Sequence, residues 1–171
     1  HSGGDIHKGR ANAIKALGRV LARAHERSPF RLASFAGGVS RNAIPREAEA
    51  VVVVDGAGEA GLREAAELEL AALREQFADS DGDLALSIEP SAASEAADDA
   101  TTRRMLDLVA ALPTGVVAMS PAVPGTVETS TSLNVAMTED GVIALASMTR
   151  SANAPALEDV VASIVAAARL A

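Results

Sequence analysis

The first residues of the chain gather side chains that could bind or polarise a substrate. Two of the three histidines, His1 and His7, lie on either side of Asp5. The glycines Gly3 and Gly4 allow positive φ angles and close backbone approach, so the polar groups beside them can be presented to a ligand. A frayed loop ahead of a helix has the same composition. From these residues alone, both interpretations stay open.

The chain offers few ligands for a metal-dependent hydrolase. Such an enzyme needs carboxylates and imidazoles that converge on metal ions, about 3.5–4 Å apart in a two-metal site. The third histidine, His25, lies on a predicted helix among charged residues, and we expect it to be a solvated surface residue. His1, Asp5 and His7 could chelate an ion incidentally, but three ligands on a glycine-rich segment do not make a preorganised zinc site. We therefore expect no metal or other cofactor in this chain.

Composition argues against several classes of function. The net charge of −8 and the sequence pI of about 4.8 are unfavourable for nucleic acid, which calls for a basic patch. The apolar runs are shorter than the roughly 20 residues that cross a bilayer, and no signal-peptide pattern is present, so we expect no membrane partner. The absence of cysteine fits a reducing compartment, and the cytoplasm is the expected location.

The spacing of apolar residues predicts which parts of the chain form helices and strands. The predicted helices cover residues 14–27, 62–77, 99–112 and 155–170, and the predicted strands cover 30–36, 48–54, 84–88, 116–119, 127–138 and 142–149. Asp98 or Asp99 is the expected N-cap of the third helix. Asp140 and Gly141 between two alternating runs form a strong hairpin signal. In the last helix, Val160, Val161, Ile164, Val165 and Ala168 are expected to face inward, whereas Lys15, Arg19 and Arg23 are expected on the outer face of the first.

Helices alternate with strands, and hairpin connections join several of the strands. This order favours an α+β fold, in which helices pack on one face of a mainly antiparallel sheet to form a two-layer sandwich. The length suits one domain, and no repeat or long linker divides it, so residues 1–171 are predicted to be a single domain. Because the chain begins at a histidine without a Met, we expect it to come from a longer protein.

Three stretches resemble one family of enzymes. They are HSGGDIHKGRANAI at 1–14, SRNAIPREA at 40–48, and VETS at 127–130 followed by TRS at 149–151. In this order they resemble the lid, or dimerisation, domain of bacterial aminoacyl-histidine dipeptidases (Xaa-His or cytosol non-specific dipeptidases). These are cytosolic two-zinc metallopeptidases that cleave Xaa-His and other dipeptides. The resemblance spans almost the whole chain, but nothing in the chain resembles the family's catalytic zinc domain.

The resemblance implies a fold and partners. It implies the same layer of sheet and helices, whose exposed edge or helix pairs with a second copy to form a homodimer. It also implies a parent enzyme with two zinc ions and a dipeptide substrate, and an isolated chain that is itself inactive.

The resemblance also assigns roles to individual residues. His1 matches a lid histidine that reaches the neighbouring subunit's active site and stabilises the oxyanion of amide hydrolysis. Arg150 matches an arginine that binds the substrate, where a planar guanidinium can grip the free carboxylate with two hydrogen bonds. Asn42 matches a second substrate-binding residue, and Thr129 and Ser130, which lie in the matching VETS motif, are further substrate-binding candidates.

Each assignment has a plainer alternative. Arg150 at a strand end fits a solvated charge, Asn42 fits a turn residue, and Thr129 and Ser130 fit surface hydroxyls. A free-standing α+β module that binds a small ligand or regulates another protein is the alternative function. A longer reading frame with metal-binding His-x-Asp and Asp-Glu-Glu motifs on either side would separate the two.

Overall fold

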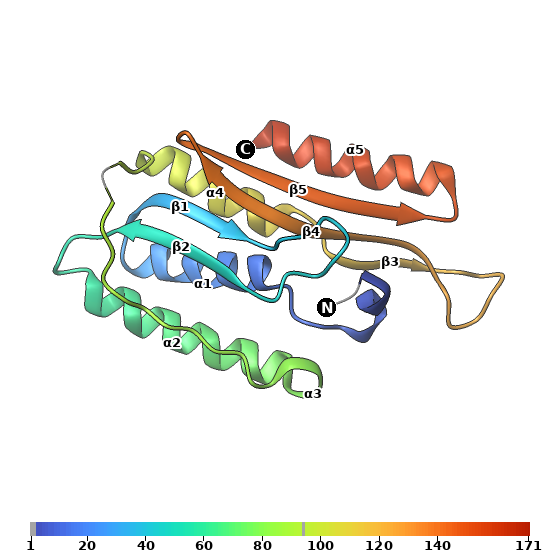
Figure 1. Cartoon of the computed structure of the whole chain (residues 1–171), viewed down its shortest axis with the longest axis horizontal. Helices are drawn as coiled ribbons and strands as arrows, with labels where there is room; N and C mark the ends of the chain where they lie inside the picture. Colours follow the sequence, from blue (N-terminus) through green and yellow to red (C-terminus); the bar gives the residue numbers. More distant parts are fainter. Residues whose placement is uncertain (1–2, 94) are drawn as a thin grey trace.

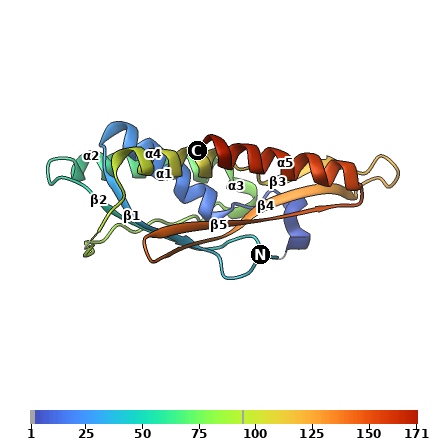
Figure 2. The ribbon, with the colours of Figure 1, turned by 90° about the horizontal axis from the view of Figure 1, so that it is seen from above.

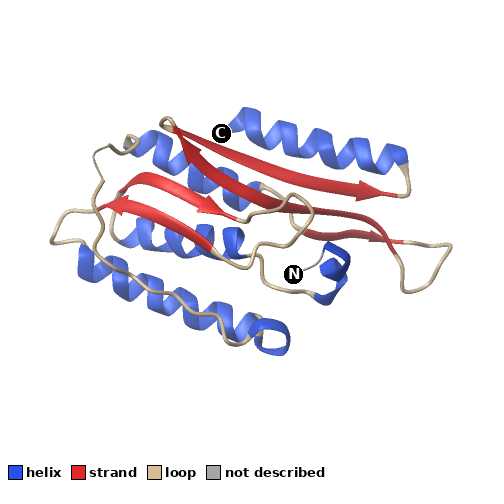
Figure 3. Ribbon diagram, viewed as in Figure 1, coloured by secondary structure: helices blue, strands red, loops and turns tan. Residues whose placement is uncertain are grey.

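The computed structural model describes residues 3–93 and 95–171, in which helices cover one face of a five-stranded antiparallel sheet (Figure 1, Figure 3). Seen from above, the helices lie on one side and the strands on the other (Figure 2). The predicted α+β fold class is therefore confirmed. The elements are η1 (Gly3–Lys8), α1 (Ala13–Arg27), β1 (Arg31–Gly37), β2 (Ala48–Val53), α2 (Glu59–Gln76), α3 (Ala78–Asp81), α4 (Asp99–Ala111), β3 (Gly115–Met119), β4 (Val127–Glu139), β5 (Val142–Ser151) and α5 (Ala154–Leu170).

The long strand β4 organises the sheet. One edge of β4 pairs with β5 through the predicted hairpin, whose turn residues Asp140 and Gly141 both have positive φ. Its other edge is shared, because β3 pairs with the beginning of β4 and β1 meets it near the end, where Gly37 is opposite Ala136. The β4–β5 register shifts between Leu133 and Val135, so Asn134 is the extra residue of a β-bulge.

Helix α1 forms the centre of the helical layer, between α2 and α4. Its N-cap Asn12 accepts a hydrogen bond from the Lys15 amide, and its apolar face buries Ile14, Leu21 and Ala24. Gly18 faces α4 so closely that a Cβ at this position would clash with the side chain of Val109. The close approach lets a core of mostly small side chains pack densely.

Two polar residues of α1 do not lie where the sequence suggested. Lys15 turns to α4, and its amine donates hydrogen bonds to the carbonyls of Val109, Ala110 and Leu112 at 2.5, 2.8 and 2.6 Å. The carbonyls at the end of a helix have no partner within it, and the Lys15 amine satisfies them. Burial lowers the pKa of this amine. His25 is only 7% exposed, because it follows Leu21 by one turn and so shares the apolar face.

The segment that follows α2 also differs from expectation. Residues 84–88 form no ladder, although Leu84, Leu86 and Ile88 alternate as in a strand. These side chains pack onto α1 and α2, while Arg74 and Arg63 donate to the carbonyls of Leu84 and Ile88. One-sided packing on helices therefore produces the same alternation as a sheet. The acidic cluster before it, residues 79–83, begins as the short helix α3.

Helix α5 packs over the β4–β5 hairpin at the margin of the molecule (Figure 1). Val160 is buried, and Ile164 packs against the core. Val161 and Val165 were expected inward but are 44% and 41% exposed, because a helix at the margin has only one layer to pack on. Within the described residues, none of the helices has the length and hydropathy needed to span a membrane.

Candidate functional site

The β4–β5 hairpin carries polar side chains on the sheet face opposite the helices. Leu133 faces the helical layer, so Ser130 and Ser132 face away from it by the two-residue period of a strand. On β5, Arg150 is directly opposite Ser130. The loop of residues 38–47 (the 38–47 loop) and η1 pass over this face (Figure 2). Four separate segments of the chain thus meet here.

These segments enclose a small depression of about 30 Å³. It is lined by residues of η1, the 38–47 loop and the hairpin: Ile6, Asn42, Ile44, Ser130, Thr131, Ser132, Asn134, Met148 and Arg150. It suits one functional group of a ligand, such as a carboxylate, rather than a whole dipeptide.

The depression brings together three predicted site residues as hydrogen-bond donors. The exposed guanidinium of Arg150 has no ion pair or hydrogen bond within the described residues. Ser40 donates to Oδ1 of Asn42 at 2.6 Å, which fixes the amide and leaves its Nδ2 without an acceptor in the described part of the chain. Ser130 adds a hydroxyl. A cation beside two neutral donors is suited to an anionic oxygen.

Two other predicted residues are not part of this group. Thr129 is fully buried on the helix-facing side of β4, where its hydroxyl lies 2.7 Å from that of Ser151. It is placed to hold the two strands together rather than to touch a ligand. The prediction for His1 lies outside the described residues.

Ser132 and Asn134 are among the residues of the depression that were not predicted from the sequence. Ser132 follows Ser130 at the strand period, so alternation alone pointed to it. Asn134 is only 3% exposed, and its Nδ2 donates to the Ala43 carbonyl in the 38–47 loop at 2.6 Å. Its place in a bulge could not be read from the sequence, because the bulge depends on the pairing with β5.

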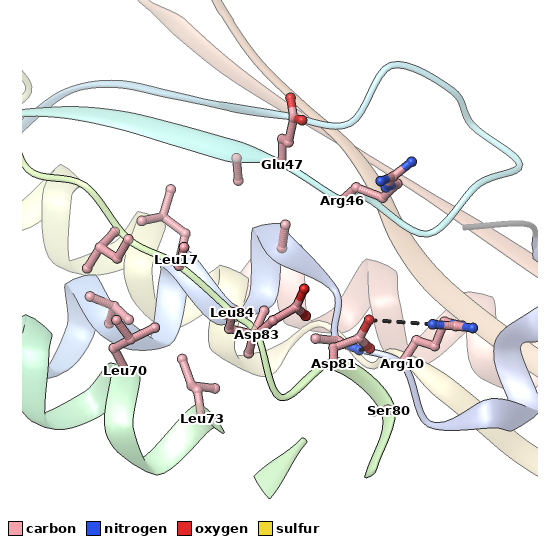
Figure 4. Close-up of a pocket in the computed structure, with 17 residues that line it drawn as sticks. Arg10, Leu17, Arg46, Glu47, Leu70, Leu73, Ser80, Asp81, Asp83 and Leu84 are labelled. Carbon is pink, nitrogen blue, oxygen red and sulfur yellow. Dashed lines mark hydrogen bonds and ion pairs between the residues drawn. The ribbon is translucent and has the colours of Figure 1, made fainter. Parts of the chain in front are cut away.

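A larger hollow of about 630 Å³ lies elsewhere, between α1, α2 and the start of β2 (Figure 4). Leu17, Leu70, Leu73 and Leu84 line one end, and Arg10 and Asp81 form an ion pair at the other. Asp81 also accepts a hydrogen bond from the Ala11 amide at 2.9 Å, so its charge ties α3 to the start of α1. This polar end is engaged in holding the fold together, and none of the predicted site residues lines the hollow.

The described residues do not fit a zinc site. Across residues 3–93 and 95–171, no three His, Cys, Asp or Glu side chains lie close enough to share an ion. Structural and catalytic zinc sites need at least three protein ligands.

The chain is similar to known peptidases. Residues 1–81 match the model of the peptidase dimerisation domain. The chain is 37% identical over 152 residues to the cytosol non-specific dipeptidase of Escherichia coli (strain K12). The chain is homologous to the dimerisation domain of peptidases. The alignment covers 88% of this domain and 31% of the Escherichia coli protein.

A solved structure agrees over nearly the whole domain. The crystal structure of aminoacylhistidine dipeptidase from Vibrio alginolyticus superposes with a TM-score of 0.91 at 32% identity, covering 97% of this domain and 34% of that chain. The domain thus spans about a third of the length of both dipeptidases.

Proposed function

We propose that this domain is the lid and dimerisation domain of a zinc-dependent dipeptidase that hydrolyses Xaa-His and other dipeptides. The names of both relatives support a dipeptidase parent, and the name of the Escherichia coli protein supports a cytoplasmic location. The match over about a third of each relative supports a separate catalytic domain in the parent. In this proposal the two zinc ions belong to that domain.

The observation that carries the proposal is the group of donors in the depression, which have no acceptor within the described residues. Arg150 binds the terminal carboxylate of the dipeptide, and Ser130 and the amide of Asn42 bind the adjoining oxygens. A charge-assisted contact of this kind contributes about 1.5–3 kcal/mol. Because the depression holds only one functional group, the scissile bond of the dipeptide extends from it toward the catalytic domain. Thr129, beneath this surface, fixes the position of β4.

In this proposal His1 stabilises the oxyanion in the neighbouring subunit's active site. Such a role requires a dimer. We propose that α5 and the free edge of β5 form its interface, because Val161 and Val165 are exposed there and β5 pairs only with β4 among the described strands. An unpaired strand edge and exposed apolar side chains both favour association with a second copy.

Assay of the parent enzyme tests the proposal. The full-length protein should hydrolyse Xaa-His dipeptides, lose activity when a chelator removes zinc, and recover it when zinc is returned. The isolated 171-residue chain should be inactive with or without zinc, because its described residues hold no zinc ligand set. Hydrolysis by the isolated chain, or a parent that binds small ligands without hydrolysing dipeptides, would contradict the proposal and favour a binding or regulatory module.

A further inference from the structure

Asn134 of β4 fastens the 38–47 loop to the strand. Its side-chain amide donates to the Ala43 carbonyl at 2.6 Å, next to Asn42. Its backbone carbonyl lies against Gly38 so closely that a Cβ on Gly38 would collide with it. Gly38 has a φ of +68°, which only glycine adopts easily. Gly38 at the start of the loop and Ala43 in its middle therefore both contact Asn134.

The bulge explains how one residue makes both contacts. Asn134 is the extra residue between two paired positions of β4 and β5, so it is not held in the regular ladder. The gap between β1 and β3 along the same edge of β4 leaves room for the loop. Asn134 is buried, and its Oδ1 has no donor within the described residues, so among these residues the bond to Ala43 alone fixes the orientation of the amide.

We infer that Asn134 is a positioning residue, which holds the 38–47 loop in place so that Asn42 lies in the depression with Arg150. Asn42 itself is exposed and, among the described residues, bonded only to Ser40 of the same loop. Nothing within its own turn fixes it relative to β5. Without the bond from Asn134, the loop keeps its local turn, but Asn42 is no longer held beside Arg150.

Hydrogen exchange on the 171-residue chain tests the positioning directly. The Asn134→Asp variant keeps the shape of the side chain but turns a carboxylate oxygen toward the Ala43 carbonyl, so two acceptors face each other. Exchange of the amides in residues 38–47, including Ala43 and Gly38, should rise by roughly tenfold or more. Gly38→Ala disturbs the other contact and should give the same result. If Asn134→Asp fails to fold, the exchange of Gly38→Ala tests whether Asn134 holds the loop.

Thr138→Ala is the matched control. Thr138 lies on the same strand and bonds to the amide and carbonyl of Phe35 at 2.9 and 3.0 Å, and among the described residues it has no hydrogen bond to the loop. It should lower the melting temperature without changing exchange in residues 38–47. Unchanged loop exchange in the folded Asn134 and Gly38 variants, or an equal increase in Thr138→Ala, would overturn the inference.

A kinetic arm rests on the proposed function and uses the full-length parent. Asn134→Asp should lower kcat/KM for a dipeptide by about the same factor as Asn42→Ala, and the double variant should be no worse than either single one. Additive losses would overturn the positioning of Asn42 by Asn134. If Asn42→Ala alone leaves kcat/KM unchanged, the proposed role of Asn42 fails, while the exchange experiment still decides whether Asn134 holds the loop.

Discussion

At the scale of single residues, His25 shows how a polar group can lie in the core of this domain. Its ring packs edge-on against Phe30, with the ring centroids 4.9 Å apart. Its Nε2 is buried and has no hydrogen-bond partner within the described residues. A buried nitrogen without a partner costs about 1–3 kcal/mol, whereas an aromatic pair contributes about 0.5–1.5 kcal/mol. The cost of the nitrogen is the larger of the two.

Replacing His25 with leucine should therefore stabilise the domain. Leucine keeps most of the apolar contact and removes the unpaired nitrogen, so the free energy of unfolding in urea should rise by up to about 2 kcal/mol. The exposed His7 provides the matched control, and His7→Leu should change stability by less than about 0.5 kcal/mol. A loss of stability in His25→Leu would show that Nε2 has a partner in solution.

The same residues mark the limit of prediction from sequence. Arg150, Asn42 and Ser130 could be named in advance because they lie in family motifs, and the structure brings them to one depression. Their unpaired state, and the enclosure of Thr129 on the other face, depend on the strand register and could not be named. His25 and Lys15 were wrongly predicted to lie on the outer surface, because their neighbours in the sequence are charged. The helical period places both side chains against packed elements.

At the scale of elements, caps and turns were the features most readily predicted. The carboxylate of Asp98 accepts a hydrogen bond from the Thr101 amide at 2.7 Å and begins α4 as expected. The hairpin turn at Asp140 and Gly141 and all four main helices also follow local signals. The extended segment of residues 84–88 could not be told from a strand, because only tertiary packing decides which surface its alternating side chains cover.

The Asp98 cap should make the stability of α4 depend on pH. The hydrogen bond from Thr101 lowers the pKa of this carboxyl below its ordinary value of 3.8. A carboxyl with a lowered pKa contributes stability above its ordinary pKa and loses it as pH falls through the lower, folded value. The melting temperature of Asp98→Ala should thus lie below that of the wild type at pH 7, and the difference should shrink in strong acid.

Two controls accompany this measurement. Asp98→Asn keeps a cap acceptor that does not titrate, so its melting temperature should depend less on acid than that of the wild type. Asp99→Ala removes a neighbouring carboxylate that does not cap the helix. A constant difference between wild type and Asp98→Ala from pH 7 to strong acid would show that the cap bond does not stabilise α4.

At the scale of the whole molecule, self-association should depend on α5. The double variant Val161→Asp/Val165→Asp puts two charges on the exposed helix face and should shift the chain from dimer to monomer in sedimentation at high micromolar concentration. Val117→Asp is the control, because Val117 is 51% exposed on β3, away from α5. Dissociation caused by Val117→Asp alone would move the interface to β3 and contradict the assignment.

We propose that Arg150 binds the terminal carboxylate of a dipeptide, and kcat/KM of Arg150→Ala in the full-length parent protein tests this role most directly. A lost contact of about 1.5–3 kcal/mol should lower kcat/KM by roughly ten- to a hundredfold or more. Arg150→Lys should recover only part of this, because lysine lacks the planar fork. Arg31→Ala, which removes an exposed arginine of β1, is the control and should have little effect. The preference for a free over an amidated C-terminus should shrink in Arg150→Ala. If both kcat/KM and this preference equal those of the wild type, Arg150 is only a surface charge and does not bind the substrate's carboxylate.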